Sequence, residues 1–356
     1  MRALVLRGHG DTSMLELADV PAPEISDPGD VRIALRAGAL NHLDLFAMEG
    51  LPGLKLDFPH ILGGDGAGVV ESVGEEVNRF QPGDRVLFNP GISCYRCEQC
   101  LAGEHSLCLE YRLVGEHLPG TLAEYIVLPH QNVAIVPTPP DPHPPISWAE
   151  AAGYSLATLT AWRMLHTRAR LQPGEVVLIW GVGGGVSSVA LSIAKVLGAF
   201  VIVTSSSKEK LAIAGDMGAD LMLNHNEVDV AREVRNVTNR RGADVVVDNV
   251  GEATWEHSLR ALGKGGRLVT CGATTGPMVV SDVRRVFWNQ YTIMGSTMGN
   301  AKDYMQIIEL LGEGKLRTRV DSTFPLERGV EAVERLRAGK QMGKVVVRIS
   351  NIQYPI

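Results

Sequence analysis

A glycine-rich turn between a predicted strand and a predicted helix places the strongest constraint on the fold of this 356-residue chain. The turn lies in VLIWGVGGGVSS (residues 177–188), after an apolar run and before apolar residues at helical spacing. Strand-like runs follow at residues 243–251, 266–276 and 291–297. Their continuous apolar character is typical of strands covered on both faces of a parallel sheet. The sequence therefore predicts an α/β fold with a doubly wound parallel sheet in this part of the chain.

The same turn is suited to the pyrophosphate of a dinucleotide. Glycines let the backbone approach a phosphate closely, and the free N–H groups at a helix N-terminus can bind it. The spacing departs from a strict G-x-G-x-x-G, because Val186 stands where the third glycine is expected. We expect Gly183, Gly184, Gly185 and Val186 to contact a dinucleotide; the alternative is a tight turn that holds no ligand.

The end of the next predicted strand indicates which dinucleotide is bound. NAD sites usually carry Asp or Glu at this place, to hold the ribose 2′-hydroxyl. Here Thr204 is followed by Ser205, Ser206 and Ser207, and Lys210 lies close behind. Hydroxyl and ammonium groups suit a 2′-phosphate, so NADPH is expected rather than NADH. The alternative is a solvated Ser/Lys loop with no ligand.

The first 135 residues predict a β-rich module instead. Short β-branched runs, among them residues 31–40 and 66–74, are separated by Gly, Pro, Asn and Asp. The proline-rich residues 136–147 then predict a semi-rigid connector or a domain boundary. Residues 148–169 have helical spacing, and residues 343–350 are strand-like again.

Four cysteines form one cluster with the spacing C-x2-C-x2-C-x7-C: Cys94, Cys97, Cys100 and Cys108. Zinc prefers four thiolates in a tetrahedron, and such a closed shell leaves no open position for chemistry. The cluster therefore predicts a structural zinc. A disulfide framework would suit a small secreted protein, and the spacing lacks the features of two common iron–sulfur patterns.

Composition limits the partners. The formal net charge is −6, with 34 Lys and Arg against 40 Asp and Glu, so no general attraction to nucleic acid or anionic lipid is expected. No apolar run of about 18 residues predicts a membrane span. Residues 1–10 are strand-like rather than typical of a signal peptide. Metal-bound thiolates fit a reducing cytoplasm, and a small molecule is the expected partner.

Together these motifs identify a family. GDGAGVVESVG, QPGDRV, the four-cysteine lobe, GTLAEY, the glycine-rich turn and GATTG are spread over nearly the whole chain. The chain resembles the medium-chain dehydrogenase/reductase superfamily, which includes zinc alcohol dehydrogenases and quinone oxidoreductases. The resemblance implies a GroES-like catalytic domain at residues 1–155 and 297–356, with a structural zinc lobe at 91–110. It also implies a Rossmann domain at 156–296 and an active site in the cleft.

The resemblance implies further properties of the site and the assembly. It completes the expected cofactor-binding set with four residues at the ends of other elements, Thr158, Asn249, Gly272 and Ser296. It also implies a homodimer or homotetramer assembled through the Rossmann sheets.

The catalytic zinc ligands of the family are missing from this sequence. Asn41 stands where alcohol dehydrogenases carry a cysteine, and Gly64 stands where they carry a histidine. The third ligand position aligns near Tyr154, and the hydroxyl that begins the family's proton relay falls at Leu43. Such alcohol oxidation needs a Lewis acid to stabilise the alkoxide, and an amide cannot replace a thiolate in that role.

A different metal site is an alternative. His42, Asp44, His60 and Asp65 lie on segments that should line the cleft. A metal held by these groups would have an oxygen-rich ligand set, unlike that of the family.

The leading hypothesis is an NADPH-dependent reductase of a carbonyl-conjugated C=C bond or a quinone. Asn41 would donate a hydrogen bond to the carbonyl oxygen, and His42 or Tyr154 would deliver the proton. One alternative is an NAD(P)-dependent alcohol or aldehyde dehydrogenase with an atypical metal site. The other is a non-catalytic NADPH-binding protein.

Overall fold

The computed structural model describes residues 1–349, whose contacts divide into two units. One unit contains Met1–Ala157 and the chain from Gly299 onward; the other is Thr158–Met298. These boundaries lie two residues from the ones expected from the sequence. Residues 350–356, which the expected catalytic domain included, lie outside the described residues.

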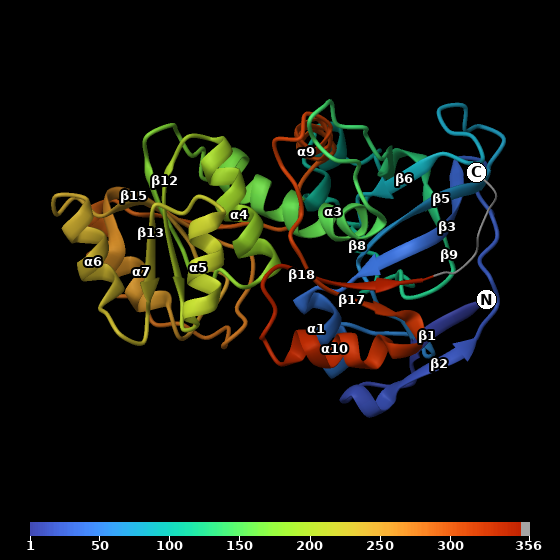
Figure 1. The fold of residues 1–356 in the computed structure, drawn as a ribbon, viewed down its shortest axis with the longest axis horizontal. Helices are drawn as coiled ribbons and strands as arrows, with labels where there is room; N and C mark the ends of the chain where they lie inside the picture. Colours follow the sequence, from blue (N-terminus) through green and yellow to red (C-terminus); the bar gives the residue numbers. More distant parts are fainter. Residues whose placement is uncertain (350–356) are drawn as a thin grey trace. The chain divides into compact units, whose positions relative to one another are not determined.

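The first unit is built mainly from strands. Its central sheet has the order β10-β6-β5-β3-β18-β17, and β9 pairs with β3 (Figure 1). Smaller sheets are formed by β2-β1-β4 and by β7-β8. The strands are β1 (Arg2–Leu6), β2 (Leu15–Asp19), β3 (Asp30–Ala39), β4 (His60–Ile61), β5 (Asp65–Val73), β6 (Arg85–Phe88), β7 (Gly91–Ile92), β8 (Arg112–Leu113), β9 (Tyr125–Pro129), β10 (Val133–Ile135), β17 (Val320–Pro325) and β18 (Lys344–Arg348).

Helices join and cover these strands. They are α1 (His42–Glu49), α2 (Glu98–Leu101), α3 (Trp148–Trp162), α9 (Ala301–Gly312) and α10 (Gly329–Arg337). Helix α3 continues into a π-helical segment, Arg163–Arg168, in the second unit. The sequence patterns did not predict α1. The proline-rich residues 136–147 connect β10 to α3 within the first unit, so they are a connector and not the domain boundary.

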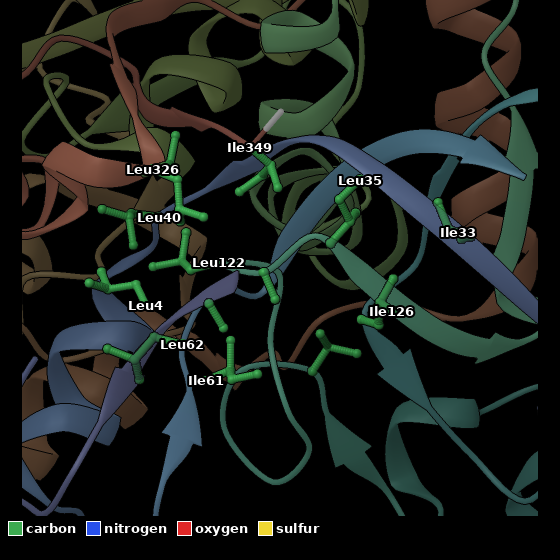
Figure 2. Close-up of a cluster of buried hydrophobic side chains, with 14 of the residues drawn as sticks. Leu4, Ile33, Leu35, Leu40, Ile61, Leu62, Leu122, Ile126, Leu326 and Ile349 are labelled. Carbon is green, nitrogen blue, oxygen red and sulfur yellow. The ribbon is translucent and has the colours of Figure 1, made fainter. Parts of the chain in front are cut away.

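Leucine, isoleucine and valine side chains from distant strands form the core of the first unit. Figure 2 shows Leu4, Leu40, Leu62 and Leu122 gathered in this cluster, and all four are at most 2% exposed. Burying a side chain of this size contributes roughly 2 kcal/mol to stability. The buried residues of β3 and β5 therefore hold the ends of these strands, where the polar residues lie, in a fixed place.

The second unit contains a parallel sheet. Among the described residues its six strands have the order β13-β12-β11-β14-β15-β16. They are β11 (Val176–Ile179), β12 (Phe200–Ser205), β13 (Leu221–Asn224), β14 (Ala243–Val247), β15 (Leu262–Thr270) and β16 (Thr292–Gly295). The helices are α4 (Gly185–Val196), α5 (Lys208–Asp216), α6 (Val230–Val237), α7 (Trp255–Ala261) and α8 (Val283–Asn289).

This strand order is that of a Rossmann fold. The first strand of the unit, β11, lies at the centre, the chain moves outward to β12 and β13, and then it returns to the other side of β11 at β14. Ligands bind outside the carboxyl ends of the strands at this reversal point, because the loops diverge there and leave a crevice. Helices α4 and α5 contact β12, and α7 contacts β14 and β15 (Figure 1). The predicted α/β class and doubly wound sheet are confirmed.

Candidate functional site

Three polar residues meet at one end of the central sheet in the first unit. Strand β3 pairs with β5 on one side and with β18 on the other, and Ala39 of β3 lies opposite both Asp65 and Val346. Asn41 follows β3, Asp65 begins β5 and Lys344 begins β18. The pairing register therefore brings these residues together although 303 residues separate Asn41 from Lys344.

A buried ion pair forms the centre of this group. The Lys344 ammonium donates to Asp65 Oδ2 at 2.8 Å, and the two side chains are only 3% and 0% exposed. Lys344 also donates to Asn41 Oδ1, and Asn41 Nδ2 donates to Asp65 Oδ2 at 3.1 Å. The backbone N–H of Leu156 donates to Asp65 Oδ1 at 2.7 Å. Each charge is thus paired and further hydrogen-bonded, which a buried ion pair requires.

Asp44, in the first turn of α1, holds the backbone next to these three residues. Its Oδ2 accepts the backbone N–H of Asn41 and its Oδ1 accepts that of Gly63, both at 2.7 Å. Burial raises the pKa of Asp44 to about 6, although both hydrogen bonds and the charge of Lys344 act to lower it. The carboxyl group therefore ties the Asn41 and Gly63 segments together.

The helix residue beside Asn41 and Gly64 is Leu156, not Tyr154. A Cβ placed on Gly64 would lie 2.9 Å from Leu156 Cδ1 and 3.7 Å from Asn41 Nδ2. The Tyr154 hydroxyl instead donates to the backbone carbonyl of Ile307 at 2.6 Å, and the side chain is fully buried. Burial raises the pKa of Tyr154 well above its ordinary value. The Tyr154 hydroxyl therefore has a structural contact inside the first unit.

The two histidines considered from the sequence lie in different surroundings. His42 is the first residue of α1, and its exposed ring packs edge-on against Phe46. His60 is buried, and its Nε2 contacts the carbonyl oxygen of Gly115 at 3.1 Å. Burial lowers the pKa of His60.

These contacts do not favour a metal held by His42, Asp44, His60 and Asp65. The Asp44 oxygens hold two backbone N–H groups, and the Asp65 oxygens hold Lys344, Asn41 and Leu156. A cation at Asp65 would compete with the ammonium group already paired there.

The four cysteines do converge. Their sulfur atoms lie within 4.8 Å of one another, and among residues 1–349 they are the group of side chains placed to hold a metal ion. The sulfur of Cys94 lies 3.5 Å from that of Cys108 and 3.9 Å from that of Cys100. Four ligands at the usual Zn–S distance would be about 3.8 Å apart, so the cluster fits tetrahedral zinc.

Backbone geometry prepares this cluster for a metal. Tyr95 has a positive φ of 54°, which turns the following N–H groups back toward Cys94. Hydrogen bonds from the backbone of Arg96 and Cys97 lower the pKa of Cys94 to about 6, while burial raises the pKa of Cys100 to about 12. Zinc binding would displace the remaining thiol protons. The predicted cysteine metal site is confirmed.

The glycine-rich turn lies between β11 and α4, at the reversal point of the Rossmann sheet. Gly181 has a positive φ of 63°, and its N–H donates to the hydroxyl of Thr204 at 3.2 Å. Gly184 precedes the first turn of α4, and a Cβ there would meet nothing nearer than 3.8 Å. The backbone is therefore open to a phosphate at the start of a twelve-residue helix.

Ser187 links the start of α4 to the parallel sheet. It is buried within α4, and its hydroxyl donates to the carbonyl of Trp180 at 2.9 Å. It also accepts a hydrogen bond from Asn249 Nδ2 at 3.3 Å. The hydroxyl therefore joins α4 to the residues that follow β11 and β14.

Two further residues of the expected cofactor-binding set have buried polar atoms that no described residue hydrogen-bonds. Asn249 follows β14, and Ser296 follows β16. Asn249 Oδ1 and Ser296 Oγ are buried and have no hydrogen-bond partner among the described residues. Such atoms are costly unless a ligand or water satisfies them, so they fit a bound dinucleotide. Gly272 follows β15, and a Cβ placed on it would lie 3.7 Å from the backbone oxygen of Asn249. Thr158 is buried in α3.

The serine-rich segment after β12 has both local and open groups. Ser207 caps α5 by accepting the N–H of Lys210, and Ser205 Oγ accepts the N–H of Ser207 at 3.1 Å. Ser206 and Lys208 are exposed. The hydroxyls of Ser205 and Ser207 therefore already shape the loop, and Ser206 and Lys208 are the exposed polar groups beside them.

Among residues 1–349, no helix combines the length and apolar character needed to cross a bilayer.

Known proteins share both units. Residues 27–139 match the alcohol dehydrogenase GroES-like domain, and residues 185–313 match the zinc-binding dehydrogenase domain. An NAD-dependent alcohol dehydrogenase of Sulfolobus acidocaldarius is 30% identical, over 98% of this chain and all of that protein. An acryloyl-coenzyme A reductase of Metallosphaera sedula is 31% identical, over 98% of this chain and 99% of that protein.

A solved structure agrees with these relatives. The crystal structure of an NAD-dependent alcohol dehydrogenase has a TM-score of 0.93 and 43% identity, over 98% of this chain and 100% of that one. The chain therefore belongs to the medium-chain dehydrogenase/reductase superfamily and is an NAD(P)-dependent oxidoreductase.

Proposed function

We propose that this protein reduces an activated C=C bond or a quinone with NADPH, without a metal at the reacting centre. The observation that supports this proposal is that Asn41, Gly64 and Leu156 lie next to one another. At the positions where this family's alcohol dehydrogenases carry zinc ligands, Asn41 has an amide, Gly64 has no side chain and Leu156 has an alkyl group. An amide N–H can stabilise an enolate oxygen, which needs less electrophilic help than an alkoxide.

The residues have distinct proposed roles. The nicotinamide of the bound cofactor supplies a hydride to the acceptor carbon. Asn41 Nδ2 donates a hydrogen bond to the carbonyl oxygen of the acceptor, where negative charge develops. His42, the next residue and solvent-exposed, delivers the proton that completes the reduction.

The test measures NADPH oxidation with a 2-enone or a quinone. We expect Asn41→Ala to lower kcat/KM about 10- to 100-fold, as the loss of one oxyanion donor does in other enzymes. His42→Gln should lower kcat and increase the solvent isotope effect if proton delivery becomes slower. Asn226→Ala, at an exposed loop residue of the second unit, is the control. An Asn41→Ala variant with unchanged reduction would refute the role of the amide.

Alcohol dehydrogenation is the second candidate, supported by the names of most of the relatives. The acryloyl-coenzyme A reductase, at similar identity, supports C=C reduction. The two functions separate in one assay: oxidation of primary and secondary alcohols with NAD+ or NADP+, before and after mild chelation. Activity that chelation removes and zinc restores would favour the dehydrogenase.

We also propose NADPH as the preferred cofactor. The supporting observation is the end of β12, where exposed Ser206 and Lys208 stand in place of an acidic residue. Ser206→Asp should repel the 2′-phosphate and weaken NADPH binding about 10-fold or more while sparing NADH. Gln172→Glu, at an exposed residue before the amino end of β11, controls for added negative charge. Equal or tighter binding of NADH by the unmodified protein would contradict the proposal.

We propose a homodimer or homotetramer that functions in the cytoplasm. Strand β16 lies at the edge of its sheet, and Phe287 and Trp288 of the neighbouring α8 are 63% and 74% exposed. An exposed edge and apolar patch of this kind favour association. Light scattering measures the mass directly, and Trp288→Glu should lower it.

The location in the cytoplasm is supported by the cysteines. Four that are placed to bind zinc and one further thiol fit a reducing compartment, which fractionation of the source cells would test.

A further inference from the structure

The ammonium group of Lys344 determines which way the Asn41 amide can face. Lys344 is 3% exposed, and it donates both to Asp65 and to Asn41 Oδ1. An ammonium group has three donors and no acceptor, so only the carbonyl oxygen of the amide can face it. The carboxylate of Asp65 has only acceptors, so only Nδ2 of the amide can face that side.

The opposite orientation would break both contacts. Rotating the amide by 180° would place Nδ2 against the ammonium and Oδ1 against the carboxylate. Two buried charges would then each meet an unfavourable dipole, which is far more costly inside a protein than in water. The buried pair therefore selects one of the two orientations.

The selected orientation leaves a donor available. Nδ2 carries two hydrogens, and Asp65 accepts one at 3.1 Å. Gly64 adjoins Nδ2: an added Cβ would lie 3.7 Å from this nitrogen and 2.9 Å from Leu156 Cδ1, so the glycine keeps a side chain out of the narrow space between the amide and Leu156. Asp65 is itself held by the N–H of Leu156, which keeps the carboxylate from turning.

We propose that Lys344 is a positioning residue, which acts through Asp65 and the Asn41 carbonyl to aim one Nδ2 hydrogen at the acceptor oxygen. This inference rests on the proposed reduction, but the orientation of the amide can be tested without it. If the Lys344–Asp65 pair served only to join β18 to β5, it would do so equally well with the Asn41 amide in either orientation.

The first experiment exchanges the two side chains and measures thermal unfolding. Asn41→Asp places a second carboxylate against Asp65, and Asp65→Asn leaves the buried ammonium without its partner. Each single variant should melt at least about 5 °C lower. In the Asn41→Asp/Asp65→Asn variant, the new amide at position 65 can accept the N–H of Leu156 and donate to the new carboxylate at position 41, which pairs with Lys344. This variant should regain most of the loss, a strongly non-additive result.

A matched control uses another buried amide of the same unit. Asn132 is fully buried, and its Nδ2 donates to the carbonyls of Asn89 and Gly91. Asn132→Asp should also destabilise the protein, but Asp65→Asn should not rescue it. Additive losses for Asn41→Asp and Asp65→Asn, as in this control pair, would overturn the proposed orientation.

The second experiment removes the two charges together. Lys344→Met/Asp65→Asn removes both charges of the ion pair, so neither is left without the other and folding should be retained. The new amide at position 65 must give its carbonyl oxygen to Leu156 and present its NH2 group to Asn41, which turns the Asn41 amide over. We expect kcat for enone reduction to fall about 10- to 100-fold with little change in KM. A folded variant with unchanged kcat would refute the positioning role.

The two experiments separate the two proposals. The exchange variant, restored in stability but carrying a carboxylate at position 41, should lose more than about 100-fold in kcat/KM, because it has no N–H to donate. If the unmodified protein does not reduce enones or quinones, the proposed function is wrong, and the unfolding measurements still decide whether Lys344 orients Asn41.

Discussion

At the scale of single residues, the chemistry of this site depends on how buried polar groups share their hydrogen bonds. Asp44 is the clearest case, because it is buried without a direct cationic partner and holds two backbone N–H groups. Its ionised form loses solvation, which raises its pKa from the ordinary 3.8 to about 6.

A pH-dependent stability follows from this shift. Because the folded state holds the Asp44 proton more tightly than the unfolded state, its contribution is fully present below about pH 4 and is lost as the pH rises through about 6. Relative to Asp44→Asn, the unmodified protein should lose on the order of 3 kcal/mol over this window. Urea unfolding of both proteins from pH 4 to 7.5 measures the difference; a difference that does not vary with pH would contradict the assignment.

Two glycines beside the site should respond differently to alanine. In Gly64→Ala the new Cβ would lie 2.9 Å from the flexible end of Leu156, which can move away, and 3.3 Å from the backbone oxygen of Val114, which must shift only slightly. We expect kcat to fall, because the space beside Asn41 is filled, while stability changes by less than about 1 kcal/mol.

Gly115→Ala is the contrasting variant. Its φ is +81°, and the new Cβ would lie 2.7 Å from backbone atoms of Gly63, which cannot move independently. This substitution should cost about 2 kcal/mol or more of unfolding free energy. Chemical denaturation of both variants tests the contrast, and equal losses would show that Leu156 does not yield.

At the scale of elements, the cysteine lobe is a short segment held by its metal rather than by a core. Its regular elements are β7, α2 and a 3-10 turn at His105–Leu107, all short, and Leu101 and Leu109 are 76% and 96% exposed. So little apolar burial cannot order a segment of this length, and zinc binding supplies the missing free energy.

Cys97→Ser should therefore release the zinc and destabilise the lobe. We expect a lower melting temperature and loss of bound zinc, with the turnover of the remaining folded protein nearly unchanged. Cys271→Ser is the matched control, since Cys271 follows β15 in the other unit and should leave the zinc content intact. A zinc-free Cys97→Ser variant with full stability would show that the metal is not structural.

At the scale of the whole molecule, the metal content distinguishes the two candidate functions. The cysteines supply one complete ligand set, whereas Asn41, Gly64 and Leu156 supply none of the thiolate or imidazole ligands that zinc prefers. We expect one zinc per chain by elemental analysis, and enone reduction unaffected by chelators that leave the cysteine site filled. Two zinc ions per chain would instead support an alcohol dehydrogenase.

The sequence by itself determined the parts whose residues are close along the chain. The four cysteines lie within 15 residues of one another, and the glycine-rich turn joins adjacent elements, so their spacing alone specifies the geometry. The apolar runs of β3, β5 and β11 also predicted their strands, because burial on a sheet requires that pattern.

Only the tertiary structure decided how the candidate site is assembled. Tyr154 and Leu156 are two positions apart, but about 100° of rotation per residue places them on opposite sides of α3, and only packing shows which side faces Gly64. Lys344 had no local signal, because its partners Asp65 and Asn41 are 279 and 303 residues away. Strand pairing of β18 with β3 brings them together, and no spacing along the chain encodes that register.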